Sequence, residues 1–299
     1  MSDTLYHYLV HVCGADHVRR DEPLARWTTF RVGGPAQFLV HVTSKAILVR
    51  LLSALKYLDY PYFILGLGAN VLASDQGFAG VVIKLDFQEI YHNDIFLYAD
   101  AGAKLGVVVG YARDQGLSGF EWAAGIPATI GGAVYMNCGA FGHSMQDCVV
   151  MVDVIDQGVV KTLTVNQLDY GYRHSVFMEK DYVILGAYFR LTPGDPTAIS
   201  QQMREILAKR AHHPKLPSAG STFKRPYDGF YVGKTIQELG LAGCQIGGAQ
   251  VSPEHAGFIV NTGGATAQDI YQLITKVQDA VRQATGVTIQ PEVIFLGKI

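Results

Sequence analysis

Short stretches of alternating apolar and polar residues, rich in valine and isoleucine, fill the first two thirds of the chain. Alternation with a period of two places one face of a strand on a core and the other toward solvent. The pattern therefore predicts a sheet-rich region. The predicted strands are Ala36–Val42, Tyr62–Leu65, Gly80–Leu85, Ile95–Ala101, Val149–Asp156, Val159–Thr164, with Gln157-Gly158 as the hairpin turn, and Tyr182–Thr192.

Helical spacing of apolar residues appears at four places and dominates the last third. Leucines at positions 48, 51, 52, 55 and 58 predict a helix over Ser44–Leu58. Asp195 and Pro196 form an N-cap and first-turn pair that opens a helix toward His212. The other two predicted helices are Lys104–Gln115, ended by Gly116, and Thr266–Thr285, closed by Gly286, before a final strand over Val287–Leu296. The expected class is α+β with at least two domains.

Composition narrows the class further. The chain has 299 residues, 49% hydrophobic and 17% charged, enough to bury a large core. A net charge of -2 with scattered lysines and arginines argues against a nucleic-acid partner. No secretory signal is visible, so we expect a cytoplasmic protein. The uncharged stretch from Trp122 to Gln146 contains glycines and Pro127, which argue against a membrane helix.

Four cysteines, Cys13, Cys138, Cys148 and Cys244, lie far apart in the chain. None belongs to a CxxC pair or has a histidine at zinc-ligand spacing. We therefore expect reduced, structural cysteines and no metal site.

Two familiar nucleotide motifs fail in this sequence. Gly66-Leu67-Gly68-Ala69-Asn70-Val71 lacks the third glycine of GxGxxG, which disfavours a Rossmann domain. Gly229–Thr235, GFYVGKT, has three residues between its glycines where a P-loop needs four, and predicts a turn entering a short helix.

Two glycine-rich loops remain as candidates for binding a diphosphate. The first follows a predicted strand, and its glycines and Asn70 allow positive φ and expose successive N–H groups, an arrangement that binds anions. The second carries no formal charge, so backbone dipoles rather than Lys or Arg would meet a phosphate there. Taken alone, the first loop is more simply interpreted as a turn, and the second as a buried strip of small residues that permits close packing. The candidate cofactor residues are Gly66, Leu67, Gly68, Ala69, Asn70, Val71 and Leu72, and then Gly125, Ile126, Pro127, Thr129, Gly131, Gly132, Ala133, Asn137, Gly139 and Ala140.

Six ordered blocks carry a resemblance to a known family. They are TTFRVGG from Thr28, GLGANVL, GIPATIGGAVYMNCGAFG, Tyr172-Arg173-His174-Ser175, AGSTFKRP and Pro291-Glu292-Val293. The chain resembles the UDP-N-acetylenolpyruvoylglucosamine reductases, flavoenzymes of peptidoglycan precursor synthesis. The segment between Tyr170 and Pro196 is compact, which is similar to the class of this family that lacks an extra substrate loop.

This resemblance implies a fold, cofactors and a reaction. The fold is an FAD-binding fold of the vanillyl-alcohol-oxidase type plus a C-terminal α+β substrate domain. It implies FAD-binding subdomains over 1–86, joined by 287–299, and over 87–197, and a substrate domain over 198–286. FAD would be bound noncovalently, and NADPH would supply the hydride that reduces the enolpyruvyl group of a UDP-sugar to UDP-N-acetylmuramate. We expect a monomer whose site is closed mainly by the third domain.

Three residues match the family's catalytic positions. The resemblance implies that Arg173 stabilises the enolate or carboxylate, that Ser221 donates a proton to the carbanionic carbon, and that Glu292 stabilises the intermediate. Serine is a poor acid, so a neighbour such as Lys224 or a water would have to relay the proton. Without the resemblance, the three are a surface ion-pair residue, a turn-capping hydroxyl and an exposed carboxylate.

Tyr172 and Lys224 lie beside these blocks and are candidates for substrate binding. Arg225 stands where many members of the family have Asn, so the substrate contact made by that Asn is not expected here. Arg225 is instead a candidate for binding the substrate's diphosphate. Another FAD oxidoreductase of the same fold, acting on a hydroxy acid or sugar, and a noncatalytic sugar-nucleotide or flavin-binding module are the alternatives.

Overall fold

The structure is a computed structural model that describes residues 2–299. The chain divides into two compact units, each assembled from three separate stretches. The first unit holds the chain up to Arg19 with Phe38–Gly66 and Val81–Ala211, and the second holds Arg20–Gln37, Leu67–Gly80 and His212–Ile299. The division into three domains over 1–86, 87–197 and 198–286 stays a prediction.

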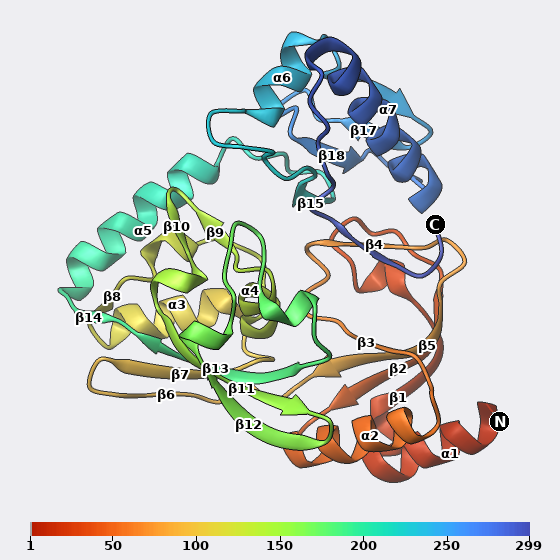
Figure 1. Ribbon diagram of the computed structural model, residues 1–299, viewed down its shortest axis with the longest axis vertical. Coiled ribbons are helices and arrows are strands. Elements are labelled where there is room, and N and C mark those ends of the chain that lie inside the picture. The colour runs from red at the N-terminus through yellow and green to blue at the C-terminus, as the bar shows by residue number, and fades with distance from the viewer. Residues whose placement is uncertain (1) are drawn as a thin grey trace. The chain divides into compact units, whose positions relative to one another are not determined.

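The first sheet has the strand order β1-β2-β5-β3. Its strands are β1 (Val18–Pro23), β2 (Pro35–Val42), β5 (Phe78–Leu85) and β3 (Tyr62–Ile64). β3 and β5 run in parallel, with Tyr62 opposite Val81. Helices α1 (Ser2–Cys13) and α2 (Lys45–Tyr57) lie side by side in the first unit (Figure 1). α2 begins where the Ser44 hydroxyl accepts the N–H of Ile47 at 3.3 Å.

A five-stranded antiparallel sheet with the order β12-β11-β13-β7-β6 forms the rest of the first unit's framework. Its strands are β6 (Ile90–Asn93), β7 (Phe96–Asp100), β11 (Val149–Asp156), β12 (Val159–Thr164) and β13 (Val183–Arg190). Gln157 and Gly158 form the β11–β12 turn with φ values of 48° and 85°, the hairpin geometry that suits the twist of two strands.

Helices and short strands complete the first unit. The helices are α3 (Leu105–Asp114), α4 (Ile130–Tyr135), which packs against β13, and α5 (Pro196–Arg210). The short strands pair as β8 (Leu117–Ser118) with β14 (Thr192–Pro193) and β9 (Gly139–Ala140) with β10 (His143–Ser144).

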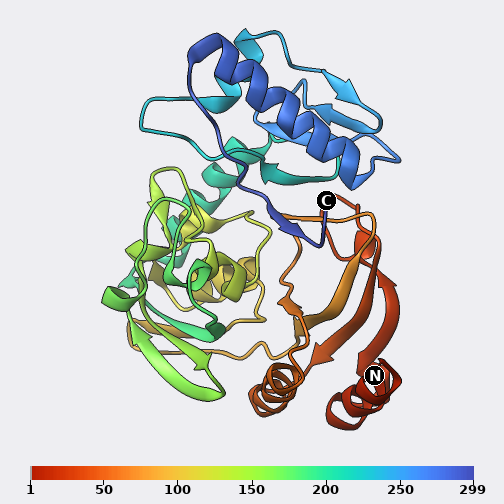
Figure 2. The same ribbon diagram turned by 45° about the vertical axis from the view of Figure 1, so that its right-hand side comes forward.

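The second unit contains a sheet of order β15-β18-β17-β16. Its strands are β15 (Ser218–Ser221), β18 (Phe258–Asn261), β17 (Ala249–Val251) and β16 (Gln245–Ile246). Helix α7 (Ala267–Thr285) packs along this sheet, and α6 (Val232–Glu238) packs against α7 (Figure 2). β4 (Val71–Ala73) pairs in parallel with β19 (Ile294–Leu296), Val71 opposite Ile294.

The start of α7 is held by two carboxylates. Thr266 and Asp269 form a capping box, in which each side chain accepts the backbone N–H of the other residue. Asp75 then accepts the N–H groups of Ala267 at 2.8 Å and Gln268 at 3.0 Å. This contact joins two stretches of the second unit that lie 192 residues apart.

Most elements predicted from the sequence are confirmed to within two residues, and the short helix predicted at GFYVGKT is α6, which begins at Val232 within the motif. The final strand is an exception, because regular pairing covers only Ile294–Leu296 rather than Val287–Leu296. Proline lacks an N–H group, and Pro291 makes only an isolated bridge to Phe223. Helix α1 was not predicted, although Leu5, Leu9 and Val12 have helical spacing and face the core.

No helix among residues 2–299 is long and apolar enough to cross a membrane. The four cysteines are free, as expected, and burial raises the pKa of the Cys148 thiol well above its usual range.

We predict that Asp75→Ala lowers the free energy of unfolding by about 1 to 2 kcal/mol, because two N–H groups at the start of α7 lose a capping carboxylate. Denaturant unfolding measures this change. Asp279→Ala, on the exposed face of α7, is the control and should cost less than about 0.5 kcal/mol. Equal effects of the two substitutions would contradict the capping role.

Candidate functional site

The first glycine loop follows β3 directly and ends in β4. Gly68 has a φ of 66°, and its carbonyl accepts the N–H of Thr29 at 3.1 Å and the Thr29 hydroxyl at 3.3 Å. Within residues 2–299, the N–H groups of Leu67, Gly68 and Ala69 donate to no protein acceptor. Unpaired donors on consecutive residues of a glycine turn form an anion-binding concavity.

The first unit brings Gly66, at the start of this loop, to the second glycine loop. A Cβ atom on Gly66 would lie 2.6 Å from Thr129 Oγ1, so any other residue there would force the Thr129 side chain to move. Lys84 of β5 donates from Nζ to the Gly66 carbonyl oxygen. Burial lowers the pKa of Lys84 to about 8, with a smaller contribution from Lys104 and an opposing one from Asp86.

The second loop uses many of its N–H groups inside the protein. It contains α4, which was not predicted, and the first four N–H groups of that helix all have acceptors. Ile130 donates to Ala103 O at 2.8 Å, Gly131 to Ala101 O at 2.9 Å, Gly132 to Thr129 Oγ1 at 3.3 Å and Ala133 to Thr129 O at 2.9 Å. Backbone dipoles at this helix start are therefore engaged already, and phosphate binding by other parts of the loop stays a prediction.

Helix α5 flanks the same loop. A Cβ atom on Gly125, which has a φ of 79°, would lie 2.9 Å from Leu207 Cδ2 and 3.2 Å from Arg210 Cδ. The Arg210 guanidinium lies 5.3 Å from the centre of the Phe141 ring. Burial lowers the pKa of Arg210. An arginine that sequence reasoning missed thus lies against the second loop.

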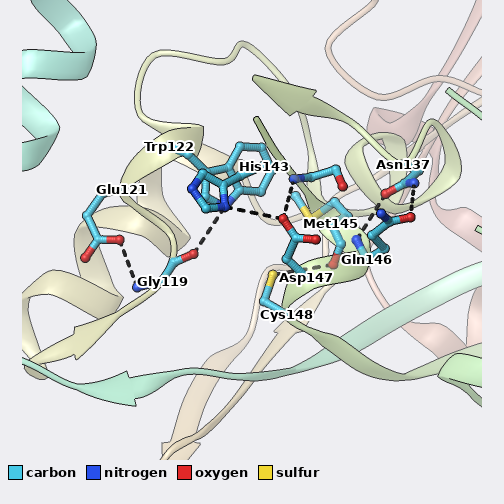
Figure 3. Close-up of polar contacts among 10 residues, drawn as sticks. Gly119, Glu121, Trp122, Asn137, His143, Met145, Gln146, Asp147 and Cys148 are labelled. Atoms are coloured by element: carbon cyan, nitrogen blue, oxygen red, sulfur yellow. Dashed lines mark hydrogen bonds and ion pairs between the residues drawn. The ribbon is translucent and has the colours of Figure 1, made fainter. Parts of the chain in front are cut away.

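The side chain of Asn137 connects this loop to the block that contains Arg173. Figure 3 shows Asn137 facing Gln146, with Nδ2 donating to Gln146 Oε1 at 3.2 Å and Oδ1 accepting the Gln146 N–H at 3.0 Å. Asn137 Nδ2 also donates to Gly171 O at 2.8 Å. The buried amide therefore positions the turn at 171–174, and its contact with a cofactor stays a prediction.

Arg173 has a backbone conformation that is unfavourable for a residue with a side chain. Its φ is 52°, and its Nη2 donates to Gly139 O at 2.7 Å. The guanidinium lies 5.3 Å from the ring centre of Tyr172, which is itself exposed. Ser175, fully buried, donates to Tyr135 O at 2.5 Å and fixes the end of the turn. Strain held by surrounding hydrogen bonds is typical of functional residues.

The second unit places Ser221 beside the segment that carries Glu292. Ser221 ends β15 and is exposed, whereas Thr222 is fully buried and accepts the N–H of Ile259 at 3.0 Å. The Glu292 N–H donates to Thr222 O at 2.8 Å, and the Lys224 N–H donates to Gln290 O at 2.8 Å. Two of the three predicted catalytic residues thus come from adjacent backbone segments.

Asn70, the fifth residue of the first glycine loop, joins this pair. Its Nδ2 donates to the carbonyl oxygen of Glu292 at 3.0 Å. The first glycine loop, Glu292 and the backbone beside Ser221 are therefore contiguous within the second unit. Arg225, by contrast, forms an ion pair with Asp228 at 3.6 Å. Arg173 belongs to the first unit.

Among residues 2–299, one group of side chains has the spacing to hold a metal ion: Asp169, His174 and Glu179. Its two carboxylates are exposed, and His174 lies 3.5 Å and 3.4 Å from them. Exposed acidic groups around a histidine commonly form without an ion, so the expectation of no metal site stays a prediction.

Comparison with known proteins identifies the class of this fold. Residues 36–164 match the FAD binding domain family, which makes the chain an FAD-binding flavoprotein of α+β class, as expected. Residues 212–296 match the C-terminal domain of UDP-N-acetylenolpyruvoylglucosamine reductase.

Relatives match over nearly the whole chain. UDP-N-acetylenolpyruvoylglucosamine reductases from Caldanaerobacter subterraneus subsp. tengcongensis and Clostridioides difficile are 39% and 40% identical, and the matches cover 100% and 98% of both partners. The crystal structure of the Thermus caldophilus reductase has a TM-score of 0.82 and 34% identity, covering 94% of this chain and 100% of that one. The chain belongs to the UDP-N-acetylenolpyruvoylglucosamine reductase family, and the alternative of another flavin oxidoreductase is not favoured.

The residues present fit an FAD diphosphate. The N–H groups of Leu67, Gly68 and Ala69 are donors of the type that such an anion needs, and they lie on a turn stabilised by Thr29. The compact stretch between Tyr170 and Pro196 holds β13 and β14. Membership of the class that lacks the extra substrate loop stays a prediction.

We predict that Gly68→Ala destabilises the protein by about 2 to 4 kcal/mol, since the positive φ and overlap of a Cβ atom with the Trp27 carbonyl oxygen both add strain. Thermal and denaturant unfolding measure the loss. Gly142→Ala is the matched control, because that position has a φ of 86° but open space around its Cβ; its cost should stay near 1 kcal/mol. A Gly68→Ala protein as stable as the control would refute the close approach.

Proposed function

We propose that Arg173, Ser221 and Glu292 carry the reduction of the enolpyruvyl group of UDP-N-acetylenolpyruvoylglucosamine to UDP-N-acetylmuramate, with FAD and NADPH. Family membership over the full chain supports this reaction. The observation that carries the residue assignment is the hydrogen bond from the Glu292 N–H to Thr222 O at 2.8 Å, which holds the Ser221 and Glu292 segments together.

Each of the two glycine loops carries candidate residues for binding the cofactor. The N–H groups of Leu67, Gly68 and Ala69 would hold the diphosphate. When bound, FAD supplies the hydride, which originates from NADPH, to the terminal carbon of the enolpyruvyl group.

Conjugate reduction leaves negative charge on the substrate next to its carboxylate. A guanidinium is always charged and donates in a planar fork, so Arg173 stabilises the enolate better than a lysine would. The strained backbone of Arg173 and its bond to Gly139 O hold the side chain in one orientation. As the protonated acid, Glu292 donates a hydrogen bond to the same charge, from a backbone held on both sides by Asn70 and Thr222.

Ser221 supplies the proton to the adjacent carbon. Its exposure at the end of β15 leaves the hydroxyl accessible to substrate, while the buried Thr222 fixes the backbone. Tyr172 and Lys224 bind the substrate, and Arg225 reaches its diphosphate when the pair with Asp228 opens. The substrate-binding roles rest on their positions beside the catalytic blocks.

We further infer that the protein acts as a cytoplasmic monomer. UDP-sugars and NADPH are intracellular metabolites, which supports the cytoplasmic location. Light scattering at micromolar concentration tests the monomer directly.

We predict that Ser221→Ala lowers kcat for substrate reduction by about a hundredfold or more while NADPH still reduces the bound flavin at its normal rate. Stopped-flow absorbance separates the two half-reactions. Ser218→Ala, in the same strand, is the control and should retain both rates. Full turnover by Ser221→Ala would exclude Ser221 as the proton donor.

We predict that the flavin is held noncovalently. No histidine or cysteine lies in the first loop, and His143 of the second loop sits 3.4 Å from the Asp147 carboxylate (Figure 3). Acid precipitation should therefore leave all yellow colour in the supernatant. Flavin that remains with the protein pellet would contradict this binding mode.

A further inference from the structure

Lys84 is a charged residue at the end of a buried strand. The three residues before it, Val81, Val82 and Ile83, are fully buried in β5. Its own amino group is largely withdrawn from solvent, and that burial lowers its pKa to about 8. Burying a charged lysine costs free energy unless hydrogen bonds or opposite charges compensate it, and such residues are often functional.

The Lys84 amino group donates to the carbonyl oxygen of Gly66, the first residue of the glycine loop. In a trans peptide, the carbonyl oxygen of Gly66 and the N–H of Leu67 point in opposite directions. Lys84 therefore fixes the direction of the Leu67 N–H, which is the first of the loop's donors without a protein acceptor in the described chain. A charged donor on the oxygen also polarises the peptide and strengthens its N–H as a donor.

Two neighbouring charges act on this cation in opposite directions. Lys104, which precedes α3 and bridges to Thr129, repels it and lowers its pKa. Asp86 acts in the opposite direction, but its carboxylate also lies 2.8 Å from His41 Nδ1. Lys84 and Lys104 thus place positive charge beside Gly66 and Thr129, both in the first unit.

We propose that Lys84 is a positioning residue for the FAD diphosphate, orienting the Leu67 N–H through the Gly66 carbonyl and adding positive charge behind the loop. This role rests on the proposed assignment of the first glycine loop to FAD. No residue of the proposed catalytic set is involved.

The test measures the dissociation constant of FAD for the reconstituted apoprotein by flavin fluorescence. Lys84→Met should weaken FAD binding about ten- to a hundredfold, the usual range for losing a charged hydrogen bond. Lys84→Arg keeps the charge and should recover most of the affinity. Lys56→Met, an exposed lysine of α2, is the control and should bind FAD as the wild type does.

The pH dependence of the FAD dissociation constant is a second test, because a purely structural role of Lys84 would not change it. Only protonated Lys84 donates to Gly66 with a full charge, so the dissociation constant of the wild type should rise above pH 8, by up to tenfold per pH unit. Lys84→Arg should stay flat from pH 7 to pH 9.5, because a guanidinium remains charged. Asp86, His41 and Lys104 are unchanged in that variant, so their titration cancels in the comparison.

The outcomes separate this role from the loop assignment. If folded Lys84→Met binds FAD normally, or if the wild type and Lys84→Arg share one pH profile, the positioning role is overturned. If Gly68→Ala also leaves FAD binding unchanged in a folded protein, the assignment of the loop itself fails. Should Lys84→Met not fold, as circular dichroism would show, the pH comparison between wild type and Lys84→Arg decides the matter.

Discussion

The last residues of the chain pair with the segment that follows the first glycine loop, and the second unit depends on that pairing. β19 extends β4 in parallel, the Ser74 hydroxyl donates to Lys298 O at 2.7 Å, and Asn70 donates to Glu292 O. These contacts close loops of more than 220 residues, and closing such a loop costs only slightly more entropy than closing a shorter one. The same backbone that shapes the first glycine loop therefore positions Glu292.

The two glycine-rich loops owe their glycines to different physical needs. The first has its carbonyl oxygens held by Thr29 and Lys84 and leaves consecutive N–H groups as donors. The second uses the N–H groups of its short helix internally, and a Cβ atom on Gly131 would come within 3.1 Å of Ala101 Cβ. Glycine there permits close packing of backbone on backbone rather than binding of an anion at the helix start.

Periodicity predicted most of the fold because the helices and strands are long enough to show their period, as in α2 and β11. The sequence did not predict α4, because the segment IGGAVY is short and rich in glycine, which disfavours helix. The site residues were predicted from the resemblance of sequence blocks, since nothing in the sequence indicates that Glu292 pairs with Thr222, the neighbour of Ser221. The contact of Lys84 with Gly66 depends on the parallel pairing of β3 and β5, which sequence patterns do not specify.

Backbone strain indicates the same candidate residues independently of the sequence blocks. Most non-glycine residues with positive φ among residues 2–299 are aspartate, asparagine or glutamine, which tolerate that region in turns. Arg31, Phe141 and Arg173 are the exceptions, with φ values of 57°, 54° and 52°. Each belongs to one of the sequence blocks that carry the family resemblance. Strain of this kind costs about 1 to 3 kcal/mol per residue and persists only where the surroundings enforce it. Its concentration in these blocks indicates that the fold gives up stability there to hold side chains in place.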